Sequence, residues 1–463
     1  LTSNSIRQLN VIHNYSYFKG KNESLLSVCN QCVTSMGRRL LKDRLLYPSL
    51  HVDVIKKRYD MIDFFSTNEL YNDIYKDLKR VSDLEKSLRK MGLHLLKPAE
   101  FFSDSLSFEY ITNVIQTLEH NSEFLTIYPT SATLISYFKD FNEYVYSVFN
   151  FENFGSSNLQ RSMFHPNVFP ELDVLDSETQ EDHEILESIQ NRLSHLLDSS
   201  ENSVKLDYDE KLGWHLYCTN KRATTFQERL TNISSGHKIH VKDKHETIIH
   251  SFSPQHFTFR KKDKSSTIIH TDYIKHISSR LKHTQHRLIQ LNNESWGKII
   301  HTLYTGHGEN LKEFYLLLAD IDFYCCGAKL SIHNKYVRPQ IQESDLSFCH
   351  VQGIRHPIVE KIHTDTEYVT NDIQLGKKHK SGLLLFGTNA CGKSTFMKSI
   401  GLNIILAQAG LYVAADEFIY KPYTQLFTRI LNNDNIFRSQ SSFAVEIQEL
   451  KSILSFSDSS SLI

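Results

Sequence analysis

Glycine and proline are scarce in this sequence. Its 463 residues include only 17 Gly and 9 Pro, which favours long helices over a loop-rich fold. Hydrophobic residues make up 40% and charged residues 23% of the chain, a balance that excludes extensive disorder. A chain of this length is too large for a single core, so we expect about two to four domains.

Long apolar runs and a net charge are also missing. No apolar run approaches the roughly 18 residues of a membrane span, and no secretion signal opens the chain. We therefore expect a cytoplasmic or nuclear protein, or an organellar one after processing, with no membrane partner. The formal net charge is −1, so contact with nucleic acid must come from local basic patches. Because residue 1 is Leu1 and not methionine, we expect an excerpt or a processed product.

The cysteine pattern excludes a disulfide framework. Seven cysteines, an odd number in a large chain without a secretion signal, predict free thiols in a reducing compartment. Cys29 and Cys32 form a C-x-x-C pair, but no second pair stands at zinc spacing. We interpret the cysteines as small buried side chains and not as metal ligands or redox centres.

The clearest motif lies between a predicted strand and a predicted helix. The apolar run 383–386 is typical of a strand that is buried on both faces of a parallel sheet. After the motif, apolar residues recur on one face of a helix that is predicted to end at Gly410. These residues are Met397, Ile400, Ile404 and Ile405.

Residues 387–394 fit G-x-x-x-x-G-K-[ST], the phosphate-binding P-loop. Glycines let backbone N–H groups curl around a phosphate, and the following helix points its positive end at it. Lys393 is predicted to reach the β- and γ-phosphates of ATP, and Ser394 to offer its hydroxyl to Mg²⁺. The candidate nucleotide-binding residues of this segment are Gly387, Thr388, Asn389, Ala390, Cys391, Gly392, Lys393, Ser394 and Thr395.

Residues 201–264 hold most of the local positive charge. They contain 12 Lys and Arg against 8 Asp and Glu, a net charge of +4, and six histidines. Apolar residues alternate around Gly213, which predicts a β-hairpin, and we expect the whole segment to be strand-like. Its densest basic clusters are Lys221 with Arg222 and Arg260 with Lys261 and Lys262. Such clusters are either solvated surface or contacts to the DNA backbone.

Helical periodicity dominates the rest of the chain. Residues 1–150 are predicted to be almost entirely helical, and 178–198 form an amphipathic helix. From Tyr273 a seam close to a heptad repeat predicts a long rod-like helix, with one more helix from Leu311 to Ile332. The composition changes near Pro339, where an α/β domain is expected to begin.

Several separated segments, taken together and in order, resemble the MutS family of DNA mismatch-repair ATPases. The resemblance covers nearly the whole chain and is far more specific than a P-loop alone. The segments are 9–12 (LNVI), 25–28 (LLSV), 34–41 (TSMGRRLL), 81–85 (VSDLE), 353–360 (GIRHPIVE), 368–372 (YVTND), 427–430 (FTRI), 433–434 (ND) and 441–446 (SSFAVE).

The resemblance implies a domain plan. It gives a mostly α-helical core and levers with a small β-rich clamp, followed by an α/β P-loop NTPase domain that is incomplete at its C-terminus. The implied boundaries are 1–177 for the helical core, 178–200 for an ascending lever helix, 201–264 for the DNA clamp, 265–335 for the descending lever and the return to the core, and 336–463 for the ATPase domain.

The resemblance also implies roles for single residues. Tyr368 would stack on adenine, and Asn371 and Asn389 would form hydrogen bonds to the nucleotide. Ser441 would reach the γ-phosphate bound by the partner of a homodimer or a MutS-like heterodimer. The basic clusters of 201–264 would contact double-stranded DNA, mismatched or branched, without sequence preference. ATP binding would then switch the clamp between open and closed states.

The chain departs from the family pattern in two places. Phe141-Asn142-Glu143 and Phe169-Pro170-Glu171 fit the family's Phe-x-Glu mismatch reader but lack its context, so we interpret both as accidental. The Walker B strand would begin at 461–463, so its Asp and Glu are expected beyond Ile463. We therefore predict ATPase activity for the full-length protein, no catalytic residue within this chain and no turnover by the chain alone.

Two alternatives to mismatch repair remain open at this stage. One is an ATPase of the same family that acts on recombination junctions or other branched DNA, and the other is a non-catalytic DNA-binding clamp. The P-loop residues 388–391 and the run 433–437 are similar to those of viral and organellar members of the family.

Overall fold

A computed structural model of the chain divides into two compact units, which are described separately. The first unit comprises Leu1–Lys90, Ser103–Asp140 and His307–Ile463, and the second comprises Met91–Phe102 and Phe141–Gly306. The structure describes residues 1–12, 22–67, 69–155, 161–197, 203–209, 211–233, 237–362, 367–376, 381–389, 391–430 and 442–463.

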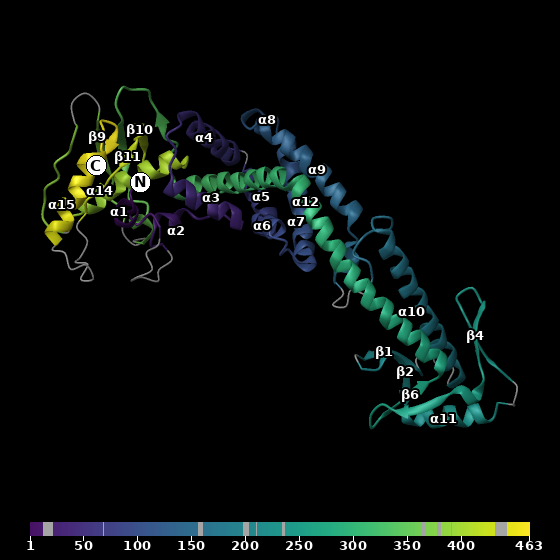
Figure 1. Cartoon of the computed structure of the whole chain (residues 1–463). Helices are drawn as coiled ribbons and strands as arrows, with labels where there is room; N and C mark the ends of the chain where they lie inside the picture. Colours follow the sequence, from purple (N-terminus) through teal and green to yellow (C-terminus); the bar gives the residue numbers. More distant parts are fainter. Residues whose placement is uncertain are drawn as a thin grey trace. The chain divides into compact units, whose positions relative to one another are not determined.

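The N-terminal third of the chain is helical, as its periodicity predicts (Figure 1). Buried apolar residues recur at helical spacing, for example Ile55, Tyr59 and Ile62 on one face of α4. The helices are α1 (Ser3–Gln8), α2 (Leu25–Cys29), α3 (Ser35–Leu46), α4 (Val52–Thr67), α5 (Leu70–Leu78), α6 (Leu84–Gly92), α7 (Pro98–Glu119), α8 (Ser122–Ile127) and α9 (Thr130–Val148).

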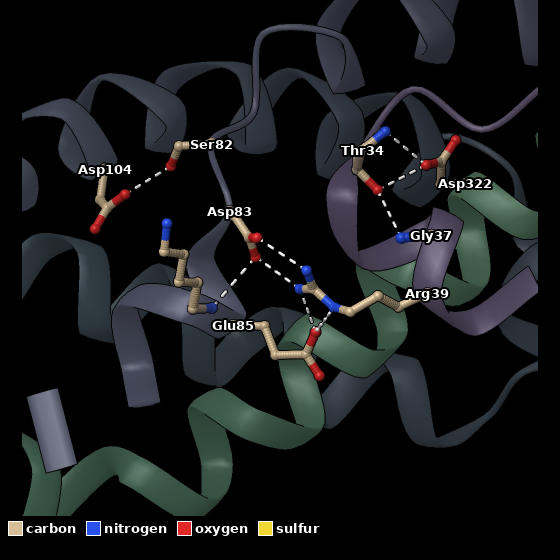
Figure 2. A network of polar contacts seen from close by, with 9 residues as sticks. Thr34, Gly37, Arg39, Ser82, Asp83, Glu85, Asp104 and Asp322 are labelled. Carbon is tan, nitrogen blue, oxygen red and sulfur yellow. Dashed lines mark hydrogen bonds and ion pairs between the residues drawn. The ribbon is translucent and has the colours of Figure 1, made fainter. Parts of the chain in front are cut away.

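Two sequence motifs of this helical region meet in the first unit (Figure 2). The Arg39 guanidinium donates to both oxygens of Asp83, at 2.9 and 2.7 Å, and its Nε donates to Glu85 at 2.9 Å. Nearby, the carboxylate of Asp322 accepts from the backbone N–H and the hydroxyl of Thr34, the residue that caps α3. These contacts fix segments 34–41 and 81–85 of the sequence against each other.

One helix, α12 (Asp272–Asn334), runs for 63 residues. The long helix predicted from Tyr273 is confirmed, but the separate helix predicted at Leu311–Ile332 is wrong, because it is the last part of α12. Gly297 and Gly306 interrupt the apolar pattern without breaking the backbone, since glycine inside a helix costs only about 1 kcal/mol relative to alanine.

The second unit pairs α12 with α10 (Pro170–Leu197). The amphipathic helix predicted at 178–198 is therefore confirmed, although it begins earlier, with Pro170 at a first-turn position that tolerates proline. The apolar seams of the two helices share one core, and Arg280 on α12 pairs with the buried Asp182 on α10. A 3₁₀ turn, Phe151–Gly155, precedes α10.

The basic segment of the second unit combines a sheet with a helix. Strands β1 (Lys205–Asp209), β2 (Gly213–Thr219), β6 (Ser266–His270) and β5 (Thr258–Lys261) form an antiparallel sheet in that order. The β1–β2 hairpin confirms the prediction around Gly213, whose φ is +72°. A two-stranded ribbon joins β3 (Ile239–Lys242) to β4 (Ile248–Phe252), and a short 3₁₀ turn, Pro254–His256, follows.

The expectation that this whole segment is strand-like is wrong. Residues Asn220–Thr231 form helix α11, capped by the Thr219 hydroxyl, which accepts from the Arg222 N–H. Its apolar residues Ala223, Phe226 and Leu230 recur at helical spacing and are buried against the sheet. The polar residues between them obscure this pattern in the sequence.

The C-terminal part of the first unit has a mixed, mostly antiparallel sheet. Its order is β7 (Gln340–Ile341), β10 (Glu417–Lys421), β8 (Phe348–Ile354) and β9 (Asn371–Leu375). β8 is antiparallel to both neighbours, and β7 is parallel to β10. A parallel pair links β11 (Gln425–Leu426) to β12 (Ser461–Leu462). The helices here are α13 (Val359–Ile362), α14 (Lys393–Ala409) and α15 (Ser442–Phe456).

The predicted buried strand at 383–386 is not observed. In the described part of the chain these residues pair with no strand, and Leu384 and Phe386 are 86% and 90% exposed. An apolar run becomes a buried strand only when neighbouring strands cover it. The helix predicted after the motif is confirmed as α14, which Gly410 ends in a left-handed conformation with φ +87°.

All seven cysteines are free thiols. Six are buried, as predicted, including Cys29 and Cys32 of the C-x-x-C pair. The prediction is wrong for Cys391, which lies in the predicted P-loop and is exposed. Within the described ranges, no group of three or more His, Cys, Asp or Glu side chains is arranged to hold a metal ion, and no helix is long and apolar enough to span a bilayer.

Candidate nucleotide site and basic surfaces

The P-loop residues gather at the N-terminus of α14. Lys393 is the first residue of the helix and follows Gly392. The backbone of Gly392 is left-handed, with a φ of +92°, a conformation that glycine adopts readily. The Lys393 ammonium donates to the carbonyl oxygens of Gly387 at 2.9 Å and Thr388 at 2.7 Å. The loop thus curls around this ammonium, which also lies 3.6 Å from the Cys391 sulfur. Ala390 lies outside the described residues.

The first turn of α14 has the chemistry of an anion site. Its N–H groups have no partners within the helix and carry the positive end of the helix dipole. Ser394, in this turn, is exposed, and Thr395 is half-buried. A Cβ placed on Gly392 would meet nothing within 4 Å, so the loop is open on that side. These features let a phosphate approach the backbone and a hydroxyl ligate a cation.

A second part of the site follows β8. His356 is buried, and its Nδ1 accepts from the N–H groups of Ile358 and Val359, both at 3.2 Å. Burial, and then the charge of Lys398, lower the pKa of His356 to about 4, so the ring is neutral at pH 7. Tyr368 is half-buried; burial raises the pKa of its hydroxyl, and the nearby backbone of His356 opposes this rise.

The remaining predicted nucleotide ligands are less constrained. Asn371 opens β9, is exposed, and donates from its side chain to the Val369 carbonyl at 3.3 Å. Asn389 is also exposed. Ser441 lies in the part of the chain that is not described. Of the predicted ligands, the structure therefore brings together the described residues of the predicted P-loop, while Tyr368 lies near the backbone of His356.

An open cavity of about 1070 Å³ adjoins the P-loop segment. The run 381–385 lines it, together with Met397 and Ile400 of α14 and Ile373 of β9. The cavity is lined mainly by apolar side chains, so the phosphate-binding chemistry is confined to the loop beside it.

The basic residues of the second unit lie on two sides of its sheet. Phe226 of α11 packs against the rings of Phe257 and Phe259, at 5.6 and 5.7 Å between centroids. The helix therefore covers the sheet face to which Phe259 points. Because side chains alternate along a strand, Arg260 points to the opposite face. Lys221 and Arg222, in the first turn of α11, belong to the other side.

Lys262 lies on the same face of the sheet as Arg260 and already has partners there. Its ammonium lies 4.1 Å from the centroid of the Tyr217 ring and 3.1 Å from Asp207, whose pKa its hydrogen bond lowers. Arg260 and Lys261 are exposed and, among the described residues, have no carboxylate within ion-pair distance. By the same alternation Lys261 points to the face that α11 covers, so the second cluster is divided and only Arg260 and Lys262 lie on the face opposite Lys221 and Arg222.

Comparison with known proteins accounts for this combination of elements. A family model described as MutS domain III matches residues 4–328, and one described as MutS domain V matches residues 383–463. The chain belongs to the MutS family. The predicted resemblance is thus confirmed.

Individual MutS homologues are similar along nearly the whole chain. A DNA mismatch repair protein mutS homolog of Acanthamoeba polyphaga mimivirus is 28% identical over 98% of this chain and 44% of its own length. A mitochondrial DNA mismatch repair protein mutS homolog of Sarcophyton glaucum is 28% identical over 96% of this chain and 43% of its own. Viral and mitochondrial proteins are thus among the relatives that the chain resembles.

Bacterial proteins match as well. The DNA mismatch repair protein MutS of Caldicellulosiruptor bescii is 25% identical over 96% of this chain and 48% of its own length. The chain spans somewhat less than half the length of these relatives.

Two features of this MutS-family chain escaped the sequence predictions. No role was predicted for His356, although its ring nitrogen accepts hydrogen bonds from two N–H groups at the start of α13. The second is the set of side chains that bind the C-terminal end of α14, among them Arg58 and Tyr59. The only sequence signal for the latter was Gly410, which marked the helix end but not its partners.

Proposed function

We propose that this chain is the core, lever, clamp and nucleotide-binding part of an ATP-dependent DNA-binding protein of mismatch repair. The observation that carries this proposal is the P-loop at the N-terminus of α14, with Lys393 inside the loop and the Gly392 side open. Membership of the MutS family and the printed names of the homologues support the same function.

The residues present fit ATP and Mg²⁺. Phosphate oxygens are better acceptors for the Lys393 ammonium than the two backbone carbonyls that it contacts now. The Ser394 hydroxyl would ligate Mg²⁺, which supplies charge neutralisation between phosphates. Tyr368 would stack on adenine, and Asn371 and Asn389 would hold polar groups of the nucleotide. The role of Ser441 at a partner's nucleotide, and hence dimerisation, belongs to the same proposal.

Binding to DNA would use the basic residues of the second unit. Lys221, Arg222, Arg260, Lys261 and Lys262 would contact phosphates of double-stranded DNA without reading bases. The bound nucleotide would bias the protein between two clamp states, as in a ligand-controlled switch. Hydrolysis is proposed for the whole protein, and a cytoplasmic, nuclear or organellar location stays a prediction.

Nucleotide binding is the first test. We expect a fluorescent ATP analogue with Mg²⁺ to bind the chain and Lys393→Ala to weaken binding by tenfold or more, since a charge-assisted hydrogen bond contributes about 1.5–3 kcal/mol. Lys42→Ala, which removes an exposed lysine from α3, is the matched control and should bind normally. Equal binding by both variants would refute a P-loop site.

The DNA part is tested separately by fluorescence anisotropy. Plain, mismatched and four-way-junction duplexes of equal length are titrated at several salt concentrations. A steep loss of affinity with salt on all three supports phosphate contacts. Tighter binding to the mismatched duplex supports a function in mismatch repair. Tighter binding to the four-way junction supports the alternative function on recombination junctions. A salt-independent affinity contradicts a DNA clamp.

A further inference from the structure

The C-terminal end of α14 is held by residues from the beginning of the chain. The last four carbonyl groups of a helix have no partners within it. Here the Ala407 oxygen accepts from the Tyr59 hydroxyl at 2.6 Å, the Gln408 oxygen from the Ser49 N–H at 2.9 Å, and the Ala409 oxygen from the Arg58 guanidinium at 2.9 Å. Donors from Ser49 to Tyr59 thus serve three of these four groups.

Of these donors Tyr59 is buried, and Ser49 and Arg58 are half-buried. Tyr59 is 1% exposed, and its hydroxyl also lies 3.1 Å from that of Tyr420 on β10. Arg58 lies against Gly410: a Cβ there would come within 2.4 Å of the Arg58 side chain. The Arg58 cation stands at the negative end of the helix dipole. The end of α14 therefore has little freedom to shift against α4.

The two ends of α14 differ in their surroundings. Every residue from Ser399 to Ala409 is buried, whereas the first turns, which carry the P-loop chemistry, are exposed or half-buried. A helix of 17 residues is a rod about 25 Å long. The contacts at the buried end therefore hold the rod whose first residues are Lys393 and Ser394.

We infer that Arg58 and Tyr59 are positioning residues of the nucleotide site, which act through α14 and carry its nucleotide state into the helical core. The inference rests on the proposed nucleotide binding. If the contacts at the C-terminal end of α14 strengthen nucleotide binding at its N-terminal turn, bound nucleotide must stabilise those contacts by the same free energy, because coupling between two sites is reciprocal. Those contacts are made by α4, which therefore responds to the nucleotide.

The response has a defined onward path within the first unit. Asp63 of α4 pairs with Arg338 and with the Tyr412 hydroxyl, and the Phe65 ring stacks on Tyr324 of α12 at 6.4 Å between centroids. A shift of α4 thus reaches α12 through packed side chains, which is the kind of contiguous network that transmits coupling.

The test is hydrogen exchange of the 463-residue chain with and without Mg²⁺ and adenylyl imidodiphosphate, with binding measured in parallel. We expect nucleotide to slow exchange over residues 52–67 in the wild type. Tyr59→Phe keeps the ring but loses the donor to Ala407, so it should abolish that protection and weaken nucleotide binding about fivefold. Arg58→Lys, which keeps the cation, should reduce the protection in part.

The matched control is Tyr128→Phe. It also removes one tyrosine hydroxyl, which donates to Asp320, and its ring contacts Lys57 of α4, but it has no part in the end of α14. This control should keep both the affinity and the protection. If Tyr59→Phe lowers the thermal stability more than Tyr128→Phe does, the inference is tested with Arg58→Lys instead.

The outcomes separate the inference from the proposed function. Nucleotide binding without any change over 52–67, or with an unchanged response in both Tyr59→Phe and Arg58→Lys, overturns the inference and leaves the P-loop site standing. No nucleotide binding by the wild type overturns both. Loss of protection in the variants but not in Tyr128→Phe supports the positioning role.

Discussion

The Thr34 hydroxyl donates to the Asp322 carboxylate over 2.6 Å, across 288 residues of sequence (Figure 2). The same carboxylate accepts from the backbone N–H groups of Val33 and Thr34, at 3.1 and 2.8 Å. Burial raises the pKa of Asp322, and these hydrogen bonds oppose that rise. Gly37 is required beside this pair, because a Cβ there would overlap the carboxylate.

Replacing this buried carboxylate should cost far more than replacing an exposed one. Asp322→Ala leaves three donors unsatisfied, so we expect a loss of about 3 kcal/mol in the free energy of unfolding. Asp83→Ala breaks a pair in which Arg39 is 47% exposed, so about 1 kcal/mol or less is expected. Urea denaturation of both variants measures the contrast, and equal losses would contradict this account.

His356 should make the first unit sensitive to acid. Its folded-state pKa of about 4 lies below the ordinary value of 6.5, so only the unfolded chain takes up a proton between these values. The free energy of unfolding therefore falls by about 3 kcal/mol as the pH drops from 6.5 to 4, and His356 does not change it above pH 6.5. His356→Asn keeps an acceptor without titrating, and we expect it to flatten this part of the stability profile. An unchanged slope would exclude His356 as its source.

Tyr368 should contribute to nucleotide affinity through its ring and not its hydroxyl. Stacking of a base on an aromatic side chain is worth about 1–3 kcal/mol, so Tyr368→Ala is expected to weaken binding of a fluorescent ATP analogue about tenfold. Tyr368→Phe keeps the ring and loses only the hydroxyl near the His356 backbone, so it should bind within about threefold of wild type. A large loss of affinity in Tyr368→Phe would show instead that the hydroxyl matters, because it holds the loop in position.

The two basic sides of the second unit should differ in DNA binding. Lys221 and Arg222 stand in the first turn of α11, where cations oppose the helix dipole but a phosphate would be favoured. We expect Lys221→Ala with Arg222→Ala to lower the salt slope of duplex binding by about two. Arg260→Ala with Lys262→Ala should lower it by about one or less, because Asp207 already neutralises Lys262. A larger drop in the salt slope for Arg260→Ala with Lys262→Ala would indicate that the duplex binds on the Arg260 face of the sheet.

Much of this protein follows from local sequence pattern. Helical periodicity gave the N-terminal helices, α10 and the long α12, and alternation around Gly213 gave the β1–β2 hairpin. The apolar pattern after the P-loop motif predicted a helix that ends at Gly410, which α14 confirms. Each of these features depends on residues a few positions apart, so the order of amino acids alone determines it.

Tertiary structure decided the features that join distant segments. No local pattern pairs Asp322 with Thr34, brings Ser49, Arg58 and Tyr59 to the end of α14, or packs α11 against the sheet. The run 383–386 shows the same limit, since it looks like a buried strand but is exposed where no neighbour covers it. Burial and the partners of polar groups depend on what the rest of the chain places nearby.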